Sequence, residues 1–112
     1  MILLLAALAA VQVPAEPPAV PAKILSGIIT VADYPPAALK RGAEGTTKVW
    51  FVVTTEGRAT DCRVVQSSGH ADLDAVVCRL ATGRMRFTPA LDAKGNARPM
   101  SAVMPVRWMA DL

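Results

Sequence analysis

The chain has 112 residues, of which 53% are hydrophobic and 19% charged, a composition typical of one globular domain with a modest core. Its net charge of +3 is small and its lysines and arginines are scattered, whereas a nucleic-acid-binding protein normally carries a clustered basic face. Composition and charge therefore argue against nucleic acid as a partner.

Residues 1–13 form a signal-like apolar segment. The stretch Ile2–Val11 is almost purely apolar and includes the small residues Ala9 and Ala10. A membrane span needs about 20 such residues, so this shorter stretch is more typical of the apolar core of a secretory signal. No lysine or arginine precedes it, so either the signal is atypical or the true start lies upstream of Met1. A buried N-terminal helix is the alternative.

Residues 14–31 are predicted to form a proline-rich linker and a lead-in arm. The sequence PAEPPAVP at Pro14–Pro21 favours an extended conformation, because proline fixes its own φ angle and restricts the residue before it. Lys23–Val31 is apolar, and it is either a lead-in strand or a packed extended arm. We place the domain itself at residues 32–112.

A short helix is predicted between Asp33 and Gly42. Prolines are favoured in a first helical turn, and glycine commonly follows the last turn. Lys40 and Arg41 fall near the predicted C-terminal end, where the helix dipole favours positive charge.

Two strands joined by a tight Glu-Gly turn are predicted at Thr46–Thr55 and about Arg58–Gln66. Alternate positions of the first strand predict a core face made up of Val49, Phe51 and Val53. Trp50 lies on the opposite face beside Lys48. It is either an exposed contact residue or a residue covered by the N-terminal arm.

The period becomes helical from Asp72, and Gly83 ends the helix. One face of this helix carries Leu73, Val76, Val77 and Leu80. A short extended piece at 84–89, a turn at 92–96 and a final strand at 101–109 complete the chain. The order helix, strand, strand, helix, strand predicts an α+β fold, with an antiparallel sheet and helices packed on one of its faces.

His70, Asp72 and Asp74 have the spacing of a candidate metal site. At the start of a helix these side chains point to more than one face, so capping and interaction with the helix dipole explain them better. Cys62 and Cys78 lack the further closely spaced ligands of a tetrahedral zinc site. We predict no metal and no cofactor.

No nucleophile–base–acid set is visible, so we do not expect an enzyme. Ser67 and Ser68 precede His70, but they do not form a nucleophile elbow, and the glycines do not form a phosphate-binding loop. In an exported protein Cys62 and Cys78 favour a disulfide that contributes roughly 3 kcal/mol. In the cytosol a reactive thiol is the alternative.

The final strand is the candidate binding element. At the edge of a small sheet, its unpaired backbone groups accept a strand from a partner, or pair with a second copy in a homodimer. Pro105 interrupts this strand and has no N–H group, so a partner strand would lack one hydrogen bond. We expect partner pairing to be strongest on one side of Pro105.

Taken in order, these features resemble the TonB C-terminal domain family between Tyr34 and Met109. The matching features are Tyr34-Pro35 before a short helix, Gly42 and Gly45 flanking Glu44, a strand ending at Glu56-Gly57-Arg58, Ser67-Ser68-Gly69, Leu73-Asp74, Arg86-Phe87-x-Pro89 and a last strand ending in Val106-Arg107-Trp108. No single feature is specific, but their order and spacing together are.

The resemblance implies a three-stranded antiparallel sheet packed with two helices, in a periplasmic protein. In the family, the domain binds the TonB box of outer-membrane receptors as a strand beside its own last strand. That contact supports energised uptake of iron chelates, cobalamin and similar nutrients. By position, the resemblance implies a partner-binding site made up of Tyr34, Pro35, Ala102, Val103, Met104, Val106, Arg107 and Trp108.

The chain departs from the family in three respects. Full TonB proteins have a membrane anchor that contacts the motor proteins ExbB and ExbD, followed by a long proline-rich spacer. Here both segments are short, so contact with ExbB and ExbD is expected only if an anchor lies upstream. Val31-Ala32-Asp33 also replaces the polar, Gln-rich residues that often precede Tyr-Pro. The alternative function is a secreted TonB-like domain with a structural or regulatory role and no energy coupling.

Overall fold

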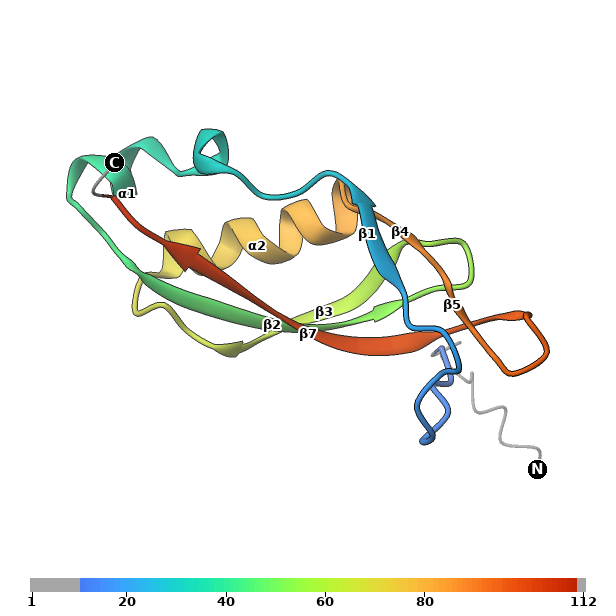
Figure 1. Ribbon diagram of the computed structural model, residues 1–112. Helices are drawn as coiled ribbons and strands as arrows, with labels where there is room; N and C mark the ends of the chain where they lie inside the picture. Colours follow the sequence, from blue (N-terminus) through green and yellow to red (C-terminus); the bar gives the residue numbers. More distant parts are fainter. Residues whose placement is uncertain (1–10, 111–112) are drawn as a thin grey trace, which may run out of the picture.

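A computed structural model of the chain (Figure 1) describes residues 11–110 and has the α+β architecture expected from the sequence. The remaining residues, which include most of the predicted signal-like segment, lie outside the described part. The elements in chain order are β1 (Lys23–Ser26), the 3-10 turn η1 (Val31–Asp33), α1 (Pro36–Lys40), β2 (Gly45–Val53), β3 (Ala59–Gln66), α2 (Ala71–Gly83), β4 (Arg86–Thr88), β5 (Ala90–Leu91), β6 (Ala97–Arg98) and β7 (Met100–Trp108).

The main sheet has three antiparallel strands in the order β3-β2-β7. The central strand β2 carries Val49, Phe51 and Val53 on its buried face, as its alternating pattern predicts. Pairing between β2 and β7 runs without a register shift from Gly45↔Trp108 to Val53↔Met100. As Figure 1 shows, α2 lies along one face of this sheet.

The β2–β3 turn depends on Gly57, whose φ angle of 77° is in the left-handed region. A side chain at this position would collide with the carbonyl oxygen of Phe87. The backbone N–H of Phe87 also donates to the Gly57 carbonyl at 2.9 Å. The turn is therefore packed directly against β4, and only glycine fits there.

The helix α2 contributes Leu73, Val76, Val77 and Ala81 to the core. A register shift in β3 places two residues, Asp61 and Cys62, opposite Phe51, and Asp61 has a positive φ angle of 56°. This bulge lies where Cys62 forms a disulfide with Cys78 of α2. The disulfide expected from the sequence is confirmed, and it ties the edge strand β3 to the helix.

The acidic residues at the start of α2 have structural partners. Asp74 accepts hydrogen bonds from Thr47 Oγ1 at 2.8 Å, from the Ser68 N–H at 2.9 Å and from the hydroxyls of Ser67 and Ser68. Desolvation raises its pKa, but these hydrogen bonds outweigh it and lower the pKa to about 2. Asp72 forms a bidentate ion pair with Arg41, at 2.7 and 2.9 Å.

The segment ahead of the domain makes defined contacts with it. Val20 and Leu91 exchange two backbone hydrogen bonds, of 3.1 and 2.8 Å, and Arg98 Nη2 donates to the Glu16 carbonyl at 2.9 Å. Further on, β1 pairs with β4 in a separate two-stranded sheet. Of the two open alternatives for residues 23–31, a lead-in strand is therefore present at its start.

On the sheet face away from α2, Trp50 is half-buried. The Arg63 guanidinium lies 4.5 Å from the centre of its ring. Val11 and Val13 line the same hollow as Trp50 and Val52, so the N-terminal segment reaches this tryptophan. No helix within residues 11–110 is long and apolar enough to cross a membrane.

Candidate partner-binding site

The strand β7 is an edge strand, because among residues 11–110 it pairs only with β2. Exposure alternates along it. The side chains turned toward the α2 side are Met100, Ala102, Met104, Val106 and Trp108, and those between them are exposed. One long side of β7 therefore has backbone groups free to accept another strand.

Pro105 lies opposite Lys48 inside the uninterrupted β2–β7 ladder. A proline fits inside such a ladder where its nitrogen points away from the neighbouring strand. Val103 and Arg107, two residues away on either side, then direct their N–H groups to the same open side. The open side of β7 thus has donors before and after Pro105 and none at Pro105 itself.

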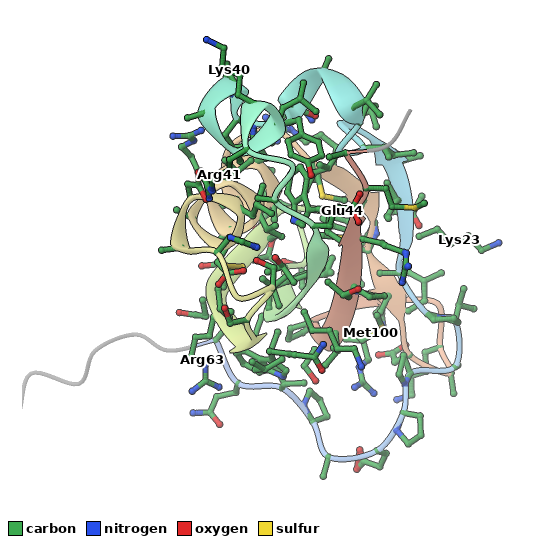
Figure 2. The ribbon with its side chains drawn as sticks, turned by 90° about the vertical axis from the view of Figure 1, so that its left-hand side faces the viewer. Lys23, Lys40, Arg41, Glu44, Arg63 and Met100 are labelled. Carbon is green, nitrogen blue, oxygen red and sulfur yellow. A yellow bond between two sulfur atoms is a disulfide. The ribbon has the colours of Figure 1, made fainter. Side chains whose placement is uncertain are left out.

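An apolar groove runs beside this open side. We call residues 22–31 the arm, and the arm groove is made up of three adjoining hollows between the arm and β7, with volumes of about 320, 300 and 190 Å³. Ile24, Ile28 and Ile29 line it from the arm, and Met104 and Val106 line it from β7. Figure 2 looks along the sheet and shows the arm on the side of β7 that faces away from β2.

Tyr34 and Trp108 close one end of the arm groove. Their rings meet edge to face, with centroids 5.1 Å apart. The Tyr34 hydroxyl donates to the Ala43 carbonyl, and Trp108 Nε1 donates to Thr47 Oγ1 at 3.2 Å. Only 7% of Tyr34 and 4% of Trp108 is exposed, so both are core residues that present an edge to the groove.

Most of the residues predicted to contact a partner line the arm groove. They are Tyr34, Ala102, Val103, Met104, Val106, Arg107 and Trp108. Pro35 lines none of the three hollows, and it instead precedes the first turn of α1. The structure therefore brings Tyr34 next to the predicted residues of β7, but it does not bring Pro35 to the groove.

The arm side of the groove was not predicted from the sequence. Ile24, Ile28 and Val31 are 45%, 62% and 64% exposed, which is unusual for three large aliphatic side chains in one short segment. Their sequence signal is an apolar stretch ahead of the domain, but nothing in it indicates that the stretch runs beside the last strand.

The candidate metal site that the sequence analysis set aside, His70 with Asp72 and Asp74, is not formed among the described residues, in which no three potential ligands cluster. Asp72 and Asp74 are paired with Arg41 and with hydroxyl groups, and His70 is the N-cap residue of α2 without a side-chain capping bond. A small α+β domain with an open edge strand beside an apolar groove has the features of a peptide-binding module.

Residues 30–109 match the family model of the Gram-negative bacterial TonB protein C-terminal. The chain belongs to this family of TonB C-terminal domains, a family of periplasmic protein-interaction domains in Gram-negative bacteria.

Two known proteins illustrate the relationship. The chain is 41% identical over 56 residues to a protein named Protein TonB from Pseudomonas aeruginosa, a match that covers 50% of this chain and 16% of that protein. It also resembles the solution NMR structure of the Pseudomonas aeruginosa TonB C-terminal domain, with a TM-score of 0.65 and 31% identity, over 81% of this chain and 88% of that one. The predicted sheet with two helices is confirmed by this likeness.

Proposed function

We propose that the domain binds the TonB box of an outer-membrane receptor as an extra strand on β7, and so supports energised transport of a nutrient such as an iron chelate or cobalamin. The observation that carries this proposal is the open side of β7 with the arm groove along it. The proposal involves no catalysis and no cofactor.

The geometry supports strand addition because it supplies two kinds of contact. Backbone groups on either side of Pro105 are available for hydrogen bonds, each contributing a net 0.5–1.5 kcal/mol, roughly. Alternate side chains of an added strand would point toward the α2 side, where the hollows are lined mainly by aliphatic residues. Ordering a flexible segment opposes these gains, so we expect an affinity around the micromolar range.

The proposal includes a periplasmic location. Disulfides persist in oxidising compartments, and the Cys62–Cys78 bond supports this location. Energised transport would also need a membrane anchor that contacts ExbB and ExbD.

Titration of isotope-labelled protein with a synthetic receptor TonB-box peptide tests the proposal. We expect amide shift changes in Met100–Met109 and in the arm, with much smaller changes in β3. A peptide of the same composition in scrambled order is the control. Shift changes that leave Met100–Met109 unaffected, or that are equal for both peptides, would count against strand addition at β7.

A further inference from the structure

One arginine connects the arm to the end of α2. The guanidinium of Arg84 donates to the carbonyls of Gly27 and Ile28, at 3.2 and 3.0 Å, and to both carboxylate oxygens of Asp33, at 2.8 and 2.6 Å. We call this set of contacts the Arg84 cluster. A planar guanidinium is suited to such a set because its N–H groups have a fixed geometry.

The backbone of the arm also lies against Arg84 at this point. Gly27 has a φ angle of 80°, and a Cβ atom there would lie 2.6 Å from the Arg84 carbonyl oxygen and 2.8 Å from Met85 Cα. Only a glycine lets the two backbones approach so closely. The arm is therefore held at Arg84 by close packing of the two backbones as well as by charge.

Asp33 also fixes the local conformation of the arm. One of its carboxylate oxygens accepts the Thr30 N–H at 2.9 Å, while the Thr30 hydroxyl accepts the Ala32 N–H at 3.3 Å. The hydrogen bond from Arg84 is the largest cause that lowers the pKa of Asp33, to about 2. The carboxylate therefore remains charged, and paired with Arg84, at neutral pH.

The residues held in this way form the far side of the arm groove. Ile28, Ile29 and Val31 lie between or beside the contact points of Arg84, and they line the two larger hollows opposite Val106 and Arg107. The position of these side chains relative to β7 sets the width of the groove. At its other end the arm is held by the pairing of β1 with β4.

We propose that Arg84 is a positioning residue for partner binding: it holds the arm at the distance from β7 at which the arm groove fits an added strand. This inference rests on the proposed function. Arg84 itself lines none of the three hollows, so it acts on the partner only through the arm.

The test compares four variants in binding of a fluorescein-labelled TonB-box peptide. Arg84→Ala is expected to weaken binding about three- to tenfold, mainly through faster dissociation, because the arm contacts are no longer held in place. Gly27→Val, which forces the arm away from Arg84, is expected to do the same. Arg84→Lys is expected to give an intermediate affinity, because an ammonium group can reach the carboxylate but cannot reproduce the several fixed N–H groups of the guanidinium.

Arg41→Ala is the matched control. It removes an equally bidentate ion pair, with Asp72, that joins α1 to α2 away from the arm groove. We expect less than a twofold change in peptide affinity for this variant. Urea unfolding of all four variants then shows whether affinity follows the state of the arm or only the overall stability.

Amide hydrogen exchange at residues 27–33, measured without peptide, shows whether the arm is released. Faster exchange there in Arg84→Ala and Gly27→Val, together with weaker binding, is the expected result. The inference is overturned if the arm is freed and affinity stays within twofold of wild type, if neither variant frees the arm, or if Arg41→Ala weakens binding equally. Wild-type protein that binds no peptide would instead contradict the proposed function.

Discussion

The two edge strands of the sheet, β3 and β7, differ in how they are protected from other strands. The pairing of β3 with β2 has two register shifts, and the Cys62–Cys78 disulfide ties β3 to α2. The pairing of β7 is regular along its whole length, and a groove lies beside it. Bulges twist an edge and hinder further pairing, so one edge is closed to strand addition and the other is open.

This difference indicates that backbone pairing and the neighbouring segments, and not the exposed side chains, distinguish the proposed binding edge from the closed one. Both strands expose a large aliphatic side chain, with Val65 of β3 56% and Val103 of β7 57% exposed. Exposed hydrophobicity therefore does not distinguish them. Regular backbone pairing and the neighbouring arm do.

The largest expected effect is on stability, and it comes from removing the disulfide that ties β3 to α2. Replacing both cysteines, as Cys62→Ala with Cys78→Ala, should lower the free energy of unfolding by about 3 kcal/mol, because the unfolded chain regains the freedom of the closed loop. Urea unfolding measures the loss. Peptide affinity of the folded protein should be unchanged. A comparable loss of affinity would mean that the two edges are not independent.

The second largest effect on stability is expected at Asp74, which joins α2 to Thr47 of β2 and to the loop after β3. Its folded pKa of about 2 lies below the ordinary value of 3.8, so its contribution is present above pH 4 and is lost as the pH falls through 2. Asp74→Asn should cost about 1–2 kcal/mol at pH 7 and less at pH 2. Urea unfolding at the two pH values measures this. An equal cost at both would show that charge is not the cause.

A substitution at Pro105 should strengthen partner binding at the open side of β7. Pro105→Val restores an N–H group on the open side, and one added hydrogen bond should tighten peptide binding by about 0.5–1.5 kcal/mol. The same change should favour self-association, because proline in an edge strand hinders pairing between copies. Peptide titration and sedimentation measure the two effects. Unchanged affinity would indicate that the nitrogen of residue 105 does not face the partner.

Much of the fold was predictable because local chemistry and long-range packing agree. The alternation of Val49, Phe51 and Val53, and the helical spacing of Leu73, Val76 and Val77, each require one buried face, and each is buried as predicted. The disulfide was predictable from two cysteines on the expectation that the chain is exported.

The parts that were not predictable depend on residues far apart in the sequence. Asp61 gives no local indication of a bulge, although it has a positive φ angle in the strand that bears Cys62. Arg84 is one of many scattered cations, and only the folded chain brings it to Gly27, 57 residues away. The arm groove depends on both ends of the domain, so only its β7 side could be inferred from the sequence pattern.

The smallest expected effect compares the two exposed valines directly. Val103 lines the third hollow of the arm groove, while Val65 lines none of the three. Both lie on an edge strand and are equally exposed, so a lysine at either position should leave stability within about 0.5 kcal/mol of wild type. For Val103→Lys we expect peptide binding to weaken about two- to fivefold, because the hollow loses apolar contact with the partner. Val65→Lys should bind as wild type does. If both lysines weaken binding equally, the effect is one of overall charge, and the open edge of β7 has no special place in binding.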